Sequence, residues 1–94
     1  MKRSYLLVYN EEFGSRDVVR DAVDGIADIT NWRVELPATI YLISEKSADW
    51  IASRLREKLG DKGRFVVLEV TSNKQGWLPK KSWQFFNEKP DPGS

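Results

Sequence analysis

Three predicted strands of this chain are apolar on both faces, and this pattern constrains the fold more than any other. Successive residues of a strand point to opposite sides of a sheet, so a sheet with one wet face alternates apolar and polar residues. Residues 5–9, Tyr-Leu-Leu-Val-Tyr, instead place large apolar side chains on both sides. Residues 40–43 and 65–68 repeat the pattern. Both faces of the predicted sheet therefore need a cover.

Two helices are predicted between these strands. Ser15 and Ser47 are good helix N-caps, because a serine hydroxyl accepts a hydrogen bond from a free backbone N–H of the first turn. Apolar residues then recur at helical spacing as far as Ile29 in the first segment and Leu59 in the second. Gly60 is a suitable C-terminal stop for the second helix.

The order of elements predicts an α+β fold with one sheet. The four predicted strands lie at residues 4–9, 31–35, 38–44 and 64–71. With the two helices they give the order β-α-β-β-α-β, the ferredoxin-like arrangement of a four-stranded antiparallel sheet with two helices on one face. In this chain of 94 residues we expect a single domain at residues 1–89, which includes a C-terminal aromatic segment at 72–89, and a disordered tail at 90–94.

Alternation along the strands divides their side chains between two faces. The side chains expected to face the helices are Leu6, Val8, Ile40, Leu42, Val66 and Leu68. The side chains expected on the helix-free face are Tyr5, Leu7, Tyr9, Tyr41, Ile43, Phe65 and Val67.

Three different covers are open for the helix-free face. The first is the aromatic segment, which forms either a short helix with Pro79 in its first turn or a fifth strand. The second is another copy of the chain packed sheet to sheet. Together they predict a partner or dimer face made of Tyr5, Leu7, Tyr41, Ile43, Phe65, Val67, Trp77, Trp83 and Phe86.

The third cover is nucleic acid. RNA-binding sheets of this topology stack bases on aromatic side chains of the central strands. Their usual basic-Gly-aromatic signature is missing here, and a net charge of +1 gives no general argument for a polyanionic partner. If nucleic acid binds, the basic residues expected to contact it are Arg54, Arg56, Lys58, Lys80 and Lys81.

The composition removes several classes of chemistry. The chain has no cysteine and no histidine, which excludes disulfides, thiol and histidine catalysis, and nearly all zinc sites. Phosphate-loop and nucleophile-elbow motifs are missing as well. We therefore predict no catalytic residue and no cofactor. A short, charged N-terminus and the lack of a long apolar run lead us to expect a cytoplasmic protein without membrane contact.

The first strand carries a resemblance. Residues 5–10, Tyr-Leu-Leu-Val-Tyr-Asn, in a β-α-β-β-α-β frame resemble the start of the small CRISPR-associated adaptation nucleases and their SinR-like and VapD-like relatives. The resemblance extends over residues 4–71. It implies dimers whose sheets face each other, with a metal ion held between the aspartates that end the first strands. Here Asn10 stands at that position, and an uncharged amide is a poor sole ligand for magnesium.

The leading interpretation is a non-enzymatic, homodimeric, protein-binding module of the SinR-like kind. The resemblance implies a setting in host defence, toxin–antitoxin or mobile-element systems. One alternative is a magnesium-dependent nuclease, whose only candidate metal ligands are Asn10, Glu11 and Glu12. The other alternative is a non-catalytic nucleic-acid-binding protein.

Overall fold

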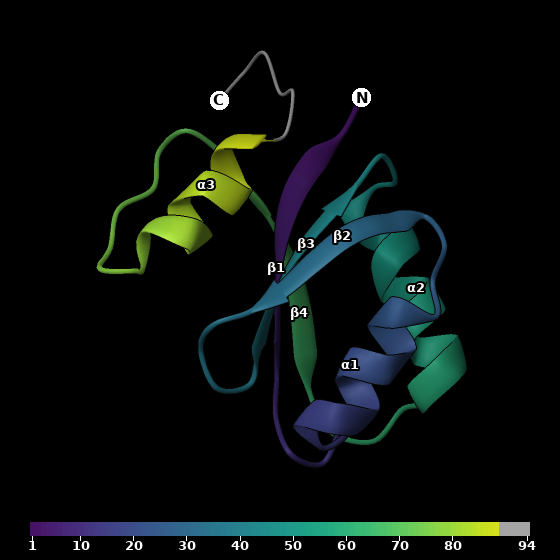
Figure 1. Ribbon diagram of the computed structural model, residues 1–94. Coiled ribbons are helices and arrows are strands. Elements are labelled where there is room, and N and C mark those ends of the chain that lie inside the picture. The colour runs from purple at the N-terminus through teal and green to yellow at the C-terminus, as the bar shows by residue number, and fades with distance from the viewer. Residues whose placement is uncertain (89–94) are drawn as a thin grey trace.

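A computed structural model describes residues 1–88 of the chain. The strands are β1 (Arg3–Tyr9), β2 (Ile29–Val34), β3 (Thr39–Ser44) and β4 (Phe65–Val70), and the helices are α1 (Arg16–Asp24), α2 (Ala48–Leu59) and α3 (Lys80–Glu88). The predicted order β-α-β-β-α-β is present and is followed by the third helix (Figure 1). The predicted tail at 90–94 lies outside the described residues.

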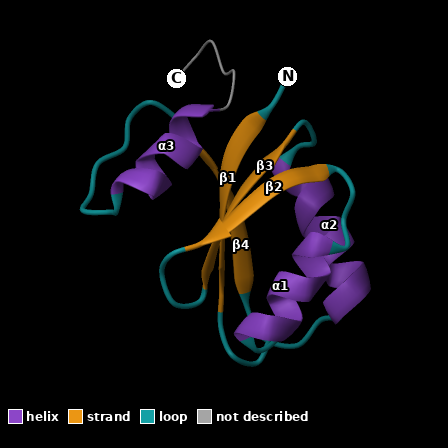
Figure 2. Cartoon of the chain, viewed as in Figure 1, coloured by secondary structure: helices purple, strands orange, loops and turns teal. Residues whose placement is uncertain are grey.

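The four strands form one antiparallel sheet in the order β2-β3-β1-β4. The central strand β1 pairs with β3 on one side and β4 on the other, so β2 and β4 are the edges. Helices α1 and α2 lie together on one face, and α3 lies on the opposite face (Figures 1 and 2). No helix within residues 1–88 has the length and apolar character needed to cross a membrane.

The predicted helix starts are confirmed, and one predicted helix end is wrong. The Val18 amide donates to Ser15 Oγ at 3.3 Å, and the Trp50 amide donates to Ser47 Oγ at 3.1 Å. α1 ends at Asp24 rather than near Ile29, because Gly25 closes the helix and the chain then turns into β2. Ile29 is still buried in the core, but as the first residue of that strand.

Strand register corrects the predicted faces of β1 and β4. Directly paired residues of antiparallel strands share a face. Tyr5 lies opposite Leu42, and Leu7 lies opposite Ile40 on one side and Val67 on the other. These residues pack with α1 and α2 in one core cluster. Five side chains predicted on the helix-free face therefore lie on the helix-covered face: Tyr5, Leu7, Tyr9, Phe65 and Val67.

The neighbouring residues along β1 and β4 show the opposite error. Leu6 pairs with both Tyr41 and Leu68, so all three belong to the helix-free face. Four side chains predicted to face the helices lie instead on the helix-free face: Leu6, Val8, Val66 and Leu68. On β3, by contrast, the predicted faces are confirmed for Ile40, Leu42, Tyr41 and Ile43.

Candidate functional site

Helix α3 covers one half of the helix-free face, over β3 and β1. Phe85 and Phe86 are buried against Tyr41, and the ring centroids of Tyr41 and Phe86 are 4.7 Å apart. Ile43 and Val70 complete this second core cluster. The ring centroids of Trp83 and Phe86 are 6.2 Å apart on one face of the helix, as the predicted helical form of the segment requires. Part of the cover is therefore the chain itself.

A polar anchor fixes α3 to the end of β2. Ser82 is fully buried, and its hydroxyl donates to Glu35 Oε1 at 2.9 Å. The same hydroxyl accepts from Arg33 Nε at 3.0 Å, while Arg33 Nη2 pairs with Glu35 Oε1 at 3.2 Å. A buried hydroxyl without partners would cost about 1–3 kcal/mol, so this triad specifies where the helix lies.

The other half of the face, over β1 and the edge strand β4, holds exposed apolar side chains. Val8, Val66 and Leu68 have exposed fractions of 37%, 45% and 50%. We call these three residues the apolar strip. Val8 lies directly opposite Val66, and Leu68 is the next residue of β4 on the same face, so the strip is continuous. Among the described residues nothing packs over it.

An apolar groove of about 300 Å³ adjoins the strip, between the sheet and α3. Leu6 joins the two, because it lines the groove and lies directly opposite Leu68. Trp77, which is 99% exposed, stands at the groove with Leu78 of the same connecting segment. The apolar side chains that line the groove are Leu6, Leu36, Tyr41, Val70, Trp77, Leu78, Trp83 and Phe86.

The structure therefore divides the predicted partner face into three groups. Tyr41 and Ile43 lie on the helix-free face but beneath α3, and Trp83 and Phe86 belong to that helix. Trp77 is exposed beside the groove. The four others face α1 and α2, where two are fully buried and two are partly buried: Tyr5, Leu7, Phe65 and Val67.

The candidate metal ligands are not brought together. Asn10 Oδ1 accepts the Phe13 amide at 3.2 Å and the Arg64 amide at 3.0 Å, so this oxygen ties the β1–α1 loop to the turn before β4. Gly63 lies so close that a Cβ there would come within 2.6 Å of the same oxygen. Glu11 and Glu12 are exposed in the loop. Within residues 1–88 no three acidic, histidine or cysteine side chains cluster as a metal site would require.

The predicted nucleic-acid contacts lie on two opposite faces of the molecule. Arg54, Arg56 and Lys58 are on α2, whereas Lys80 and Lys81 are on α3. Arg54 pairs with Glu57 and Arg56 pairs with Asp61, each at 2.9 Å. These five residues do not form one basic surface.

Burial changes the acidity of all three tyrosines. Desolvation raises the pKa of Tyr5 and Tyr9 on the helix-covered face and of Tyr41 beneath α3. For Tyr41 the nearby Glu35 carboxylate raises the pKa further, and Arg33 acts against this rise. All three hydroxyls are therefore protonated at neutral pH and can donate hydrogen bonds.

Sequence reasoning missed the true apolar strip because it placed these side chains under the helices. Alternation along β2 marks the faces of that strand only: Trp32 and Val34 are apolar, while Asn31 and Arg33 are polar. The faces of β1 and β4 follow from strand pairing, which no local pattern shows. Comparison with known proteins finds no match for the chain among family models, curated proteins or solved structures.

Proposed function

We propose that this chain is a non-enzymatic, cytoplasmic, protein-binding module with a ferredoxin-like fold that acts as a homodimer. The element order and the strand order β2-β3-β1-β4 support the fold assignment. The SinR-like and host-defence setting is part of the proposal and rests on the resemblance of residues 5–10. Use of Asn10 Oδ1 for two backbone amides supports a structural rather than a catalytic strand end.

The apolar strip is the observation that carries the proposal. Three neighbouring aliphatic side chains at 37–50% exposure, beside a tryptophan at 99%, leave much apolar surface in water for a small domain. Exposed apolar patches of this kind mark interaction surfaces. Burial of each such side chain is worth roughly 1–2 kcal/mol, because apolar burial contributes about 25 cal/mol per Å².

A second copy is the partner that this surface fits. Val8, Val66 and Leu68 carry no charge, so two strips related by a twofold axis meet without like-charge repulsion. α3 occupies the other half of the face and restricts the contact to the strip, the groove and Trp77. Because only half a sheet is open, we expect a dimer that dissociates on dilution rather than an obligate one.

Mass in solution tests the proposal. The wild-type protein should pass from monomer to dimer with increasing concentration in sedimentation-velocity or light-scattering measurements. Leu68→Lys should abolish this change, because it places a charge in the strip, where the strip meets the groove. Val18→Lys is the matched control: Val18 is 49% exposed on α1, against 50% for Leu68, so it should leave the dimer intact.

Two outcomes contradict the proposal. A wild-type protein that is monomeric at every soluble concentration has no self-association to explain. A dimer that Leu68→Lys and Val18→Lys weaken equally is formed through another surface.

A further inference from the structure

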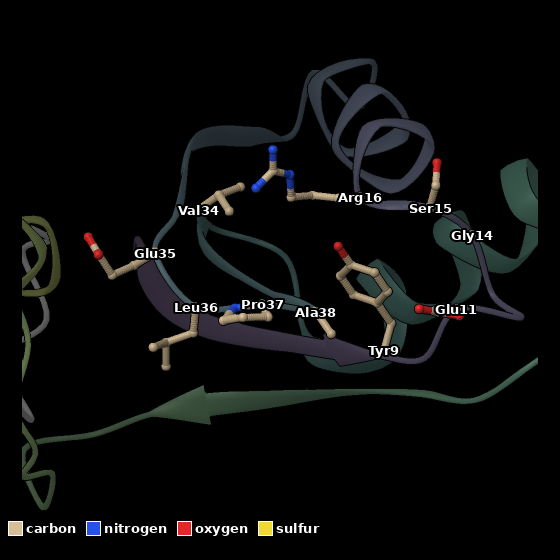
Figure 3. A pocket seen from close by; sticks show the side chains of 10 residues that line it. All are labelled: Tyr9, Glu11, Gly14, Ser15, Arg16, Val34, Glu35, Leu36, Pro37 and Ala38. Carbon is tan, nitrogen blue, oxygen red and sulfur yellow. The ribbon is translucent and has the colours of Figure 1, made fainter.

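An open pocket of about 630 Å³ lies on the helix-covered side of the molecule, away from the apolar strip. Its walls come from the end of β1, the start of α1 and the β2–β3 hairpin (Figure 3). Pockets of this size accept small organic ligands. The hairpin contributes the apolar wall through Val34, Leu36 and Pro37.

A buried hydroxyl without a partner faces this pocket. Tyr9 is only 7% exposed, and its hydroxyl makes no hydrogen bond among residues 1–88. Figure 3 shows the ring rising from the end of β1 with the hydroxyl directed towards Arg16. A phenol that is buried and unsatisfied costs free energy, so it marks a place where a ligand atom can supply the missing acceptor.

Positive charge lies beside that hydroxyl, at the start of α1 (Figure 3). Arg16 is the first residue of the nine-residue helix α1, and its exposed guanidinium forms no ion pair within the described part of the chain. The first backbone N–H groups of a helix point out of its N-terminus and favour a negative charge there. Because the arginine side chain is exposed and unpaired, it is able to move aside and admit a ligand to the Tyr9 hydroxyl.

Nearby acids limit the charge that the site can accept. Glu11 and Glu35 line the pocket, and Asp17 lies next to Arg16 in the chain. Glu35 is already engaged by Arg33 and Ser82, and Asp17 pairs with Arg20 at 3.4 Å. Glu11 is exposed and adds a carboxylate to the lining of the pocket. A single negative charge therefore suits the pocket better than the double charge of a phosphate.

We propose that this pocket binds a small carboxylic acid with an apolar body. Arg16 and the Tyr9 hydroxyl would hold the carboxylate at the N-terminus of α1. Val34, Leu36 and Pro37 would pack on the apolar body. Leu36 also lines the groove, but Arg16 and Tyr9 lie outside the proposed dimer contact, so failure of the dimer would leave this test standing.

Titration with phenylacetate, followed by amide chemical shifts, tests the proposal on the full chain. Saturable shifts are expected at residues 9, 16 and 34. Phenylacetamide, which has the same shape without the charge, should bind at least about tenfold more weakly, because a charge-assisted hydrogen bond is worth about 1.5–3 kcal/mol and 1.4 kcal/mol is tenfold. Phenyl phosphate and inorganic phosphate, which carry more charge, should also bind more weakly.

Three variants separate the site from non-specific binding. Arg16→Gln should weaken phenylacetate binding about tenfold or more. Arg20→Gln, the same change one turn further along α1, should weaken binding much less than Arg16→Gln, since Arg20 does not line the pocket and acts on it only through Asp17. Tyr9→Phe should weaken binding several-fold and raise the unfolding temperature of the free protein, because it removes a buried hydroxyl without a partner.

The proposal is overturned if phenylacetate causes no saturable shift at these amides. Equal loss of binding in Arg16→Gln and Arg20→Gln also overturns it, because the effect is then one of general charge. Should Tyr9→Phe destabilise the free protein, an ordered water satisfies the hydroxyl and the argument from it fails. Arg16 is exposed, so Arg16→Gln is expected to fold and keeps the test decisive.

Discussion

The two faces of the sheet are built from similar side chains but are covered very differently. On one face α1 and α2 bury Leu7, Ile40 and Leu42 completely. On the other, α3 buries Tyr41 and Ile43, while Val66 and Leu68 stay about half exposed. Residue type therefore does not decide burial here. What decides it is whether a helix is available above each strand.

The comparison also separates what stabilises the fold from what is open to a partner. The helix-covered face is held by elements in the middle of the chain. The other face depends on α3, which is fixed by two phenylalanines and the Arg33–Glu35–Ser82 triad. We expect mutations on the two faces to differ in how much stability they remove and in how much of the structure they loosen.

The largest difference is expected between two identical substitutions. Leu7→Ala removes a side chain that is 0% exposed and should destabilise the protein by about 2–5 kcal/mol. Leu68→Ala acts on one that is 50% exposed and should change stability by less than about 0.5 kcal/mol. Urea unfolding at a protein concentration low enough to keep the chain monomeric measures both. Similar losses for the two variants would contradict the contrast between the faces.

Phe86→Ala is expected to cause the second-largest loss of stability. Truncation of a buried phenylalanine costs about 3–5 kcal/mol when the surrounding structure cannot detach. Helix α3 packs only on the helix-free face and can detach from it, so we expect about 2 kcal/mol and loss of exchange protection confined to α3. Trp77→Ala, at a side chain that is 99% exposed, should change the free energy of unfolding of the monomer very little. Protection lost across β1 and β3 in Phe86→Ala would show that α3 is an integral part of the core.

Ser82→Ala tests the polar anchor of α3. Arg33 and Glu35 remain paired, so the loss should be about 1 kcal/mol, the net value of a typical hydrogen bond. Ser53→Ala in α2 is the matched control, because it makes the same change at an exposed helical position. Hydrogen exchange of the α3 amides should increase in the first variant and not in the second. Unchanged exchange in Ser82→Ala would mean that the phenylalanines alone hold the helix.

The smallest expected effect is on tyrosine ionisation. Because burial raises the folded-state pKa of all three tyrosines above the ordinary value of 10.0, protonated tyrosine stabilises the fold fully below about pH 10. This stability is lost as pH rises through the folded pKa. In Phe86→Ala the pKa of Tyr41 should fall back towards 10, while Tyr5 and Tyr9 stay raised. Carbon-13 shifts of labelled tyrosines against pH check this, and a parallel fall of all three would contradict it.

Sequence pattern predicts the elements of this fold better than the faces of its strands. The serine N-caps and the α2 stop follow from local hydrogen bonding and are confirmed. Alternation shows that Leu6 and Leu7 lie on opposite sides, but both are apolar leucines. Which one meets the helices depends on pairing with β3, more than thirty residues away in the chain. No local signal in β1 carries that information.

The candidate sites show the same limit. The aromatic segment predicts a cover for the sheet, and α3 provides half of it. The pocket beside Tyr9 joins three segments that are distant in the sequence, so no single motif marks it. Asn10 looks like a substituted metal ligand in the sequence, whereas its position makes it a clamp between two loops.

The position of α3 after all four strands has a consequence for biosynthesis. All four strands and both covering helices are made before Lys80, so the sheet can form while Tyr41 and Ile43 still lack their cover. Until α3 leaves the ribosome, Tyr41, Ile43 and the apolar strip form one uncovered apolar surface that can contact the wrong neighbours. A chain shortened to stop before Lys80 is therefore expected to form the sheet but to aggregate, and α3 keeps the completed sheet soluble.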